Sequence, residues 1–430
     1  MNNNLLVKII DFWQKVGQQD KLYNRAFVEF INMENKEVVD IMGPRRSGKS
    51  SVLKLLIRKL KEKENWLYIN FEDPFFVENN SPQIIEELIE TYKEYFSQSL
   101  RYLFFDEIQN IKNWETAVRK LRDSGQYKIF VTGSSSKLLS SELSTLLSGR
   151  HLSYTLLPLS FPEYLLFKDF KIIKRKDFVL HEKAIIKHFD DYLHYGGFPE
   201  IVLTGNQELV KQYYTDIIQR DIIMRYDVRE KDILEKMGLF LISNATKIIS
   251  FSSLKKLYKI SYELAANYID YFKESFLLFE LPQFSYSLKT QQKSFKKIYA
   301  IDTGLANAVS FRFSEDKGRI LENTVFLHLK RMACPVYYFK SNSLSEVDFV
   351  VKKSDGSKQL IQVAWSLDDK TTRDRELSGL RDGSSALKAQ NAILLTYNTR
   401  EKLSLDGKII QVMPVYEWML ENEMKAAKKK

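Results

Sequence analysis

The chain has 430 residues, which is too long for one ordinary hydrophobic core and predicts two to four domains. Its hydrophobic share of 44% and charged share of 28% are typical of a folded globular protein and exclude a largely disordered chain. With 65 Lys and Arg against 55 Asp and Glu, the net charge is +10. This excess is compatible with a polyanionic partner but does not require one, because net charge also keeps a protein soluble.

Cys334 is the only cysteine of the sequence, so neither a disulfide framework nor a four-cysteine zinc site can form. A single thiol suits a reducing compartment. Residues 1–6 contain no basic segment followed by an apolar stretch, so we expect no signal peptide. No apolar run approaches the ~20 residues of a membrane-spanning helix. The sequence therefore predicts a cytoplasmic protein without a membrane partner.

The first third of the chain alternates short apolar runs with helical patterns. Strands that alternate with helices form parallel βαβ units, so an α/β domain with a parallel sheet is expected here. The expected elements, in chain order, are a strand at 38–42, a helix at about 50–63, a strand at 66–71, a helix at 86–96, and strands at 102–105 and 128–132.

Residues 43–50 read Gly-Pro-Arg-Arg-Ser-Gly-Lys-Ser and fit the P-loop pattern G-x-x-x-x-G-K-[ST], with a predicted strand before it and a predicted helix after it. The backbone N–H groups of such a loop wrap a phosphate at a helix N-terminus. Lys49 would contact the β- and γ-phosphates of ATP, and Ser50 would bind Mg²⁺. A chance match is the weaker interpretation in this setting. The residues expected to bind the nucleotide are Gly43, Pro44, Arg45, Arg46, Ser47, Gly48, Lys49, Ser50 and Ser51.

An acidic pair, Asp106-Glu107, directly follows the strand at 102–105. Asp106 is expected to hold the Mg²⁺ shell, and Glu107 to polarise the attacking water as a general base. Acidic pairs are common in loops, but this one stands 57 residues after Lys49 with one strand in between. The combination favours a P-loop ATPase with its own catalytic acid over a kinase or a GTPase.

The strand at 128–132 continues into the serine-rich segment 132–136. ATPases of this type insert this strand between the strands of the two preceding motifs, so that a polar side chain at its tip senses the γ-phosphate or the water. Ser134 is the expected residue, with Ser135 as the alternative. A serine-rich turn or a helix N-cap is the competing interpretation.

Phosphoryl transfer spreads charge over the equatorial oxygens, and an arginine supplied in cis or in trans stabilises that charge. Arg150 is the expected arginine finger, and Arg45 and Arg46 of the loop are alternatives. A solvated surface arginine is an equally good interpretation of Arg150.

Residues 249–279 fit a helix-turn-helix whose second helix, at 262–273, is N-capped by Ser261. A winged helix of this kind contacts DNA in many proteins and another protein in others, so both partners stay open. The second helix would expose Tyr262, Glu263, Asn267 and Asp270, which do not form a basic face. The wing-like stretch after it carries lysines that could contact DNA phosphates, namely Lys289, Lys293, Lys296 and Lys297.

Taken in order, these motifs resemble an archaeal and bacterial family of AAA-type ATPases related to the STAND group. In that family a P-loop domain precedes a winged-helix segment and a C-terminal domain with a PD-(D/E)xK nuclease-like fold. The resemblance covers almost the full length and implies ATP hydrolysis, whereas DNA binding is usually inferred for the family. Its carriers are residues 43–50, 68–73, 103–109, 132–135, 147–150, 158–164, 195–200 and 346–351.

The resemblance and the patterns together predict an α/β chain: a parallel-sheet P-loop ATPase domain, a helical lid, a winged helix-turn-helix and a C-terminal restriction-endonuclease-like α/β domain. The strands of the last domain are expected at 336–339, 347–351, 360–363, 392–396 and 409–414. The expected boundaries are 1–157, 158–232, 233–305 and 306–424, with a basic tail at 425–430.

A PD-(D/E)xK site holds Mg²⁺ between carboxylates and uses a lysine to position the attacking water. Glu322 and Asp348 match the acidic positions of the resemblance. The next strand should read acid-x-Lys but supplies Gln362 and Ala364, so we expect a vestigial site without nuclease activity. Two nearby lysines could replace the missing one, Lys352 and Lys353.

The expected function is Mg²⁺-dependent ATP hydrolysis coupled to a conformational change on double-stranded DNA, with ATP and Mg²⁺ as cofactors and a homo-oligomer as the working form. Two alternatives stay open. One is a STAND-type regulatory switch that acts through assembly with a protein partner, and the other is an ATP-dependent nuclease.

Overall fold

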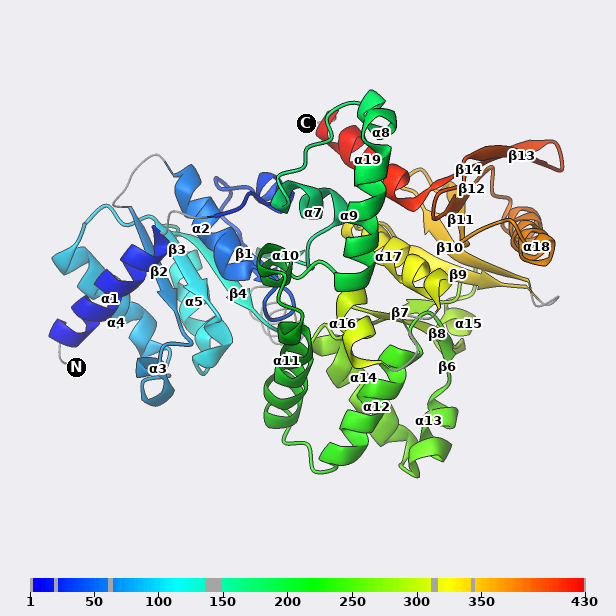
Figure 1. Cartoon of the computed structure of the whole chain (residues 1–430). Helices are drawn as coiled ribbons and strands as arrows, with labels where there is room; N and C mark the ends of the chain where they lie inside the picture. The colour runs from blue at the N-terminus through cyan, green and yellow to red at the C-terminus, as the bar shows by residue number, and fades with distance from the viewer. Residues whose placement is uncertain are drawn as a thin grey trace. The chain divides into compact units, whose positions relative to one another are not determined.

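The computed structural model describes residues 3–18, 22–60, 65–135, 149–310, 316–341 and 345–428 (Figure 1). The chain divides into two compact units. The first unit consists of residues 1–157 with 274–276, and the second of residues 158–273 with 277–430. None of the helices in the described ranges combines the length and the apolarity that a membrane span requires.

A five-stranded parallel sheet forms the centre of the described part of the first unit, in the order β2-β3-β4-β1-β5 (Figure 1). β4 lies between β3 and β1, as the sequence predicts for an inserted strand. The sequence did not predict β5, because this edge strand has no fully buried residue and lacks an apolar run. The bounds are Val38–Met42 for β1, Trp66–Asn70 for β2, Tyr102–Asp106 for β3, Lys128–Gly133 for β4 and His151–Thr155 for β5.

Apolar side chains fill the space between this sheet and α2. Val52, Leu53 and Leu56 of α2 are fully buried. They belong to one cluster with Phe104 and Phe130, whose rings stack at 4.8 Å. The helices are α1 (Asn3–Gly17), α2 (Lys49–Lys59), α3 (Phe75–Glu78), α4 (Gln83–Tyr95) and α5 (Trp114–Asp123), with 3₁₀ turns at Ala26–Phe30 and Ile108–Asn110.

The second unit begins with helices. α7 starts with a capping box, in which the Ser160 hydroxyl accepts from Glu163 N and the Glu163 carboxylate accepts from Ser160 N. The helices that follow are listed by their bounds: α7 (Phe161–Phe167), α8 (Lys176–Leu180), α9 (Glu182–Tyr195), α10 (Pro199–Thr204), α11 (Glu208–Asp216), a π-helical segment (Ile217–Met224) and α12 (Lys231–Ser243).

The glycine pair between α9 and α10 makes a close contact with a distant part of the chain. Gly196 has a φ of +78°, and a Cβ there would lie 1.9 Å from the Asp302 carboxylate. Gly197 N donates to Asp302 Oδ2 at 2.7 Å, and Asp302 also caps α16 (Thr303–Val309) through Leu305 N. The glycines that interrupt the helical pattern of the sequence are therefore the residues that allow this tertiary contact.

The segment predicted as a winged helix contains two helices and a three-stranded antiparallel sheet in the order β6-β8-β7, counted over described residues. Lys259 ends α13 with a φ of +55°, and the Ser261 hydroxyl accepts from Leu264 N at 3.0 Å, so the predicted N-cap is confirmed. The winged-helix assignment itself stays a prediction. The bounds are β6 (Ile248–Ile249), α13 (Phe251–Tyr258), α14 (Tyr262–Glu274), β7 (Leu278–Pro282), α15 (Leu288–Lys293) and β8 (Lys296–Ala300).

The remainder of the second unit contains a mixed sheet, six-stranded in its described part, in the order β13-β14-β12-β11-β10-β9. β10 is antiparallel to β9 and β11, whereas β11, β12 and β14 are parallel. The strands are β9 (Val336–Lys340), β10 (Glu346–Lys352), β11 (Lys358–Val363), β12 (Asn391–Thr396), β13 (Glu401–Leu405) and β14 (Lys408–Pro414). The helices are α16 (Thr303–Val309), α17 (Lys317–Arg331), α18 (Lys370–Leu387) and α19 (Val415–Lys428).

α18 was not predicted, and its composition explains why. Its sequence contains Ser-Gly and Asp-Gly pairs that are typical of loops. The two glycines are instead contact points: a Cβ at Gly379 would lie 2.3 Å from Glu346 O, and one at Gly383 would lie 2.6 Å from the Val347 side chain. The missing side chains thus let α18 lie directly against β10.

Candidate functional site

Two glycines and a buried arginine fix the loop between β1 and α2. Gly48 has a φ of +97°, which favours glycine. Gly43 has no room for a side chain, because a Cβ would lie 2.2 Å from Leu156 O. Arg25 Nη1 donates to Ser47 O at 2.9 Å, and its Nη2 donates to Leu157 O at 3.0 Å. The protein itself therefore sets the shape of the loop.

The Lys49 ammonium lies inside this loop, and only 4% of the residue is exposed. Its Nζ donates to Gly43 O at 3.1 Å and to Pro44 O at 3.2 Å, and lies 3.3 Å from Glu107 Oε1. The N-terminal end of α2 starts at the same residue. Loop N–H groups, the helix terminus and the ammonium together favour an anion at this place.

Asp106 ends β3 and is fully buried. Its carboxylate accepts from Tyr68 Oη at 2.9 Å, from Thr132 Oγ1 at 2.5 Å and from the Ser50 hydroxyl. Burial and the neighbouring charge of Glu107 raise the pKa of Asp106, and these hydroxyl groups oppose the shift. Asp106 is thus held by side chains from three other elements, β2, β4 and α2, and contacts Ser50.

Glu107 adopts the left-handed conformation, with a φ of +51°, and its backbone N donates to Thr132 Oγ1 at 3.0 Å. Its carboxylate accepts from Gln109 Nε2 at 2.6 Å. Burial alone would raise the pKa of Glu107, but Lys49, the Gln109 amide and Arg45 lower it below its ordinary value. The carboxylate is therefore charged near neutral pH and can accept a proton.

The donor set fits a nucleotide with Mg²⁺. Ser50 and Asp106 offer a hydroxyl and a carboxylate oxygen in mutual contact, and Mg²⁺ prefers oxygen ligands. Among the described residues, the buried hydroxyls of Ser47 and Ser135 have no hydrogen-bond partner. Buried polar groups without a partner are costly, so a phosphate oxygen would relieve that cost at Ser47.

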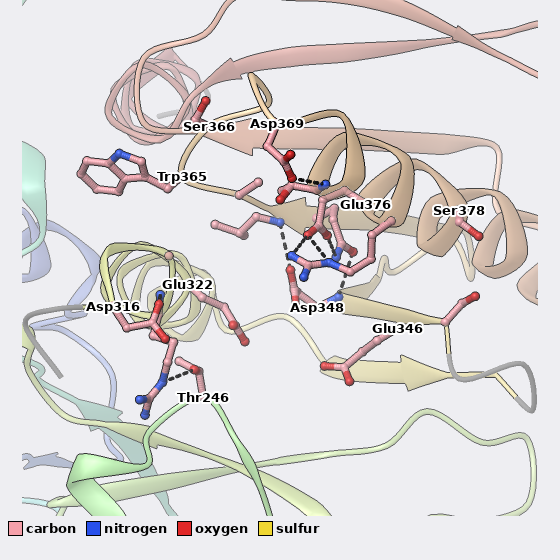
Figure 2. Close-up of a pocket in the computed structure, with 18 of the residues that line it drawn as sticks. Thr246, Asp316, Glu322, Glu346, Asp348, Trp365, Ser366, Asp369, Glu376 and Ser378 are labelled. Carbon is pink, nitrogen blue, oxygen red and sulfur yellow. Dashed lines mark hydrogen bonds and ion pairs between the residues drawn. The ribbon is translucent and has the colours of Figure 1, made fainter. Parts of the chain in front are cut away.

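A second polar site is a cavity of about 990 Å³ within the second unit (Figure 2). Seven carboxylates and four basic side chains line it. Figure 2 shows the carboxylates of Glu322, Glu346 and Asp348 reaching toward one another from α17 and β10. The surplus of acidic over basic side chains gives the cavity a negative lining.

Lys297 of β8 lies among these three carboxylates with 3% of the residue exposed. Its Nζ is 3.0 Å from Glu322 Oε1, 3.2 Å from Asp348 Oδ1 and 2.5 Å from Glu346 Oε1. Tyr299 Oη donates to the same Glu322 oxygen at 2.7 Å. Burial alone would lower the pKa of Lys297, but the carboxylates, Glu322 first, raise it well above its ordinary value.

The polar network continues behind Asp348. Its backbone N donates to Gln362 Oε1 at 3.2 Å, and its Oδ2 accepts from Val363 N at 2.9 Å. Gln362 Nε2 donates to Glu376 of α18, and Arg375 Nε donates to the other oxygen of that carboxylate at 3.0 Å. Gln362 thus connects Asp348 to a glutamate that the sequence did not single out.

Comparison with known families divides the chain into three parts. An AAA domain matches residues 35–165, and two domains of unknown function, DUF8612 and DUF4143, match residues 186–316 and 317–418. The uncharacterized protein MJ1544 of Methanocaldococcus jannaschii is 39% identical over 427 residues, which cover 94% of this chain and 93% of that protein. The chain belongs to the MJ1544 family.

Another relative of the MJ1544 family is an uncharacterized protein of Haemophilus influenzae, 29% identical over 411 residues that cover 93% of this chain and 98% of that protein. Among solved structures, the STAND protein PH0952 from Pyrococcus horikoshii, which has a tetratricopeptide repeat sensor, shares 16% identity and a TM-score of 0.29. The match covers 74% of this chain and 47% of that chain.

The AAA match contains the loop at 43–50 as well as Asp106 and Glu107, so the prediction of a P-loop AAA-type ATPase domain is confirmed at that level. The roles of the individual residues stay predictions. The winged-helix and nuclease-like assignments also stay predictions, because the families that match those parts carry no assigned function.

In this member of the MJ1544 family, Arg150 lies far from the loop. Its carbonyl accepts from the backbone N of Val38 at 3.2 Å, so Arg150 lies beside the first residue of β1. The P-loop follows the last residue of that strand, Met42. A strand of five residues separates the two by roughly 16 Å. Arg150 Nη1 instead pairs with Asp123 Oδ1 at 3.1 Å. The prediction that Arg150 acts as the finger of its own site is therefore wrong. That it acts in the site of a neighbouring copy stays a prediction.

The two loop arginines differ in position. Arg45 Nη1 pairs with Glu72 Oε1 at 2.7 Å and influences Glu107 electrostatically. Arg46 is exposed and has a φ of +66°. Ser51 lies in the first turn of α2 and is half-buried. Of the arginines that we considered as a finger, Arg45 is thus the one whose charge acts within the site.

The remaining predicted residues are only partly brought together. Ser134 and Ser135 are buried directly after β4, while Ser136 and residues 147–148 lie outside the described residues. Thr132, at the end of the same strand, is the residue that contacts Asp106 and Glu107. The proposed replacements for a nuclease lysine, Lys352 and Lys353, are exposed and do not line the cavity, so that prediction is wrong.

Several site residues were missed although a signal existed for some. Asn70 ends β2 beside Asp106 of β3, and its Nδ2 lies 3.4 Å from Asp106 Oδ2; Tyr68 lies two residues earlier on the same strand and also reaches Asp106. The carboxyl ends of parallel strands meet at one sheet edge, so this pairing could have been inferred. Arg25 and Lys297 gave no signal, because each reaches its site from a segment distant in sequence.

Proposed function

We propose that the chain hydrolyses ATP with Mg²⁺ at the loop between β1 and α2. The observation that carries the proposal is that Lys49 lies 3.3 Å from Glu107 while Ser50 bonds to Asp106. Lys49 would bind the β- and γ-phosphates, and Ser50 and Asp106 would hold Mg²⁺. Mg²⁺ would supply positive charge that neutralises the phosphates during transfer.

Glu107 would accept the proton of the attacking water. Its charged state is supported by the lowered pKa, and the Gln109 hydrogen bond of 2.6 Å would orient it. Ser134, or Ser135 with its unpartnered hydroxyl, would contact the γ-phosphate or that water. Arg45 would add positive charge from the loop, and Arg150 would act only in a neighbouring copy.

The test is steady-state phosphate release at saturating Mg-ATP for the wild type and for Lys49→Ala. Removing a charged group that stabilises developing phosphate charge should lower turnover at least about 100-fold. Lys59→Ala is the matched control, because Lys59 lies at the other end of α2 and pairs with Glu29. Equal turnover in Lys49→Ala and Lys59→Ala would refute the proposal.

We further propose that ATP turnover drives a conformational change on double-stranded DNA. The support is the net charge of +10 and the exposed Lys289 and Lys293 between β7 and β8. Two other expected lysines do not support it, because Lys297 is buried among carboxylates and Lys296 Nζ donates to Gln291 O at 2.6 Å. Duplex DNA should stimulate turnover in a salt-dependent manner, and Lys289→Ala with Lys293→Ala should abolish that stimulation.

A STAND-type switch that assembles with protein is the second candidate. The exposed face of α14 favours it, because Glu263 and Asp270 place negative charge where a DNA-reading helix would carry positive charge. Light scattering with ATP and with ADP separates the two. Nucleotide-dependent homo-oligomers that ignore DNA would support the switch, and an Arg150→Ala defect confined to the oligomer would support its action in trans.

A further inference from the structure

The nuclease-like fold that we expect for the C-terminal part implies a divalent metal ion between Glu322 and Asp348. The structure puts an ammonium group there instead. Lys297 Nζ lies within 3.2 Å of oxygens of Glu322, Asp348 and Glu346. We infer that Lys297 is a built-in cation that takes the place of the metal ion, and that the native chain binds no divalent metal in this cavity.

Geometry makes the lysine and a metal ion mutually exclusive. Mg²⁺ requires its oxygen ligands at about 2.1 Å, in a nearly ideal octahedron. The oxygens of Glu322, Glu346 and Asp348 surround Nζ at 2.5–3.2 Å, so their shared centre is already filled. An ammonium group donates three hydrogen bonds, and three carboxylates accept here. The three donors of the ammonium group are therefore used without a further ion, although its single charge offsets only one of the three carboxylate charges.

The neighbouring acidic groups are also committed to protein donors. Asp348 Oδ2 accepts from Val363 N, and Glu376 accepts from Arg375 and Gln362. Gln362, which stands where the fold's third motif has an acid, therefore serves as a neutral bridge. In the part of the chain that the structure describes, no group of three or more His, Cys, Asp or Glu side chains has an arrangement suited to a metal.

The lining charge argues against a phosphodiester substrate. With seven carboxylates and four basic side chains, Lys297 included, the cavity carries a surplus of negative charge. A metal ion is what normally lets such a site attract a phosphate despite its carboxylates. Because Lys297 is held by Glu322, Glu346 and Asp348, its ammonium group is not available to a substrate phosphate. The three other basic side chains of the lining leave the acidic surplus in place.

The origin of Lys297 adds a mechanical consequence. Lys297 belongs to β8 of the sheet β6-β8-β7, whereas Glu322 belongs to α17 and Asp348 to β10. Separating that sheet from the C-terminal elements would strip a buried ammonium of three carboxylates. Breaking one buried ion pair typically costs several kcal/mol. The two parts therefore move as one body, and a nucleotide-driven motion does not open this cavity.

The first test measures Mn²⁺ binding to the full-length, nucleotide-free chain by isothermal titration calorimetry. The wild type is compared with Asp348→Asn. Any Mn²⁺ that binds near Ser50 contributes equally to both isotherms and drops out of the difference. We expect both proteins to give the same isotherm. A wild-type site that is at least tenfold weakened by Asp348→Asn would overturn the inference.

The second test removes the cation. Lys297→Met leaves Glu322, Glu346 and Asp348 facing one another, and we expect it to gain a Mn²⁺ site at least tenfold tighter than any in the wild type. Adding Asp348→Asn should remove that site. Lys296→Met is the matched control, since Lys296 is the sequence neighbour but does not line the cavity. A folded Lys297→Met chain without a new site would refute the inference.

Should Lys297→Met fail to fold, the charge-compensated pair Lys297→Met with Glu346→Gln decides. If Lys297 is the counter-ion of the cluster, this pair regains the cooperative thermal unfolding transition that Lys297→Met lacks, and Mn²⁺ raises the temperature of that transition. A pair that also lacks the transition, or one whose transition Mn²⁺ does not raise, would overturn the inference. ATP turnover, which depends on Lys49 and Glu107, tests the proposed function separately.

Discussion

Glu107→Gln isolates the proposed base with the smallest change of shape. The substitution keeps the length of the side chain but removes its charge, next to Lys49 at 3.3 Å and Gln109 at 2.6 Å. A positioned general base contributes about 10²–10⁴-fold to rate, which corresponds to about 3–5 kcal/mol of transition-state stabilisation. We expect turnover at saturating Mg-ATP to fall within that range.

Nucleotide binding should survive the same change. A buried carboxylate opposes the approach of the negatively charged γ-phosphate, and Glu107 also competes with the phosphates for the Lys49 ammonium. Glu107→Gln should therefore bind a fluorescent ATP analogue as tightly as the wild type or more tightly. Gln109→Leu is the comparison, because it removes only the orienting hydrogen bond, and we expect a loss of about tenfold or less.

The pH dependence follows from the direction of the shift. The pKa of Glu107 lies below its ordinary value of 4.5, so the carboxylate is still ionised at pH 5. Protonation of this base should therefore not lower turnover between pH 8 and pH 5. Turnover of Glu107→Gln within threefold of the wild type would refute the assignment. Loss of binding instead of turnover would show that Glu107 maintains the structure of the site.

Three further substitutions probe the fold around the site and the core. Gly43→Ala places a Cβ 2.2 Å from Leu156 O and should destabilise the chain by about 1–3 kcal/mol in thermal unfolding. Gly318→Ala is the control, because its Cβ would meet only Asp316 at 3.6 Å. Equal unfolding temperatures of the two variants would contradict the steric argument. Thr132→Val removes one of the hydroxyl partners of Asp106 and leaves the backbone N of Glu107 without its partner. It should cost about 1–3 kcal/mol and raise the Mg²⁺ concentration needed for half-maximal turnover. Burial and Arg331 lower the pKa of His328 to about 3, so the unfolded chain takes up a proton below pH 6.5 that the folded chain refuses. This contribution to stability is therefore full above pH 6.5 and is lost as the pH falls toward 3, by about 2 kcal/mol at pH 5. His328→Gln should remove this loss from the difference in unfolding free energy between pH 8 and pH 5. Identical pH profiles of wild type and variant would exclude His328 as the cause.

The nucleotide-binding part of the chain was largely predictable because its information is local. Apolar runs gave β1 to β4, and the loop and the acidic pair each follow a strand directly. Parallel strands bring such segments to one sheet edge without further information. The same rule, applied to β2, would have found Asn70, which pairs with Asp106, but not Tyr68, which lies in the middle of that strand. It also shows why Arg150, which precedes its strand, lies at the opposite edge.

The C-terminal site was not predictable in the same way, because it depends on contacts between distant segments. Gly379 and Gly383 resemble loop residues in the sequence and become contact points only when α18 lies against β10. That contact brings Glu376 to Gln362. Lys297 was expected on a DNA-facing surface because it stands in a basic stretch. Strand alternation at β8 does not reveal which neighbour a buried lysine will find.

The two polar sites differ in how firmly each holds its lysine, and this difference decides which of them can do chemistry. Lys49 has one carboxylate at 3.3 Å and two carbonyl oxygens, which the phosphates of ATP can replace. Ser50 and Asp106 stand ready beside it for a metal. Lys297 has three carboxylates and is surrounded by groups that are already bonded. A ligand could displace Lys49 from Glu107 at the cost of one contact, whereas displacing Lys297 would leave one buried and two half-buried carboxylates without their counter-ion. We therefore expect reaction chemistry at the first site, and we infer that the second holds the sheet of β6, β7 and β8 to the C-terminal elements.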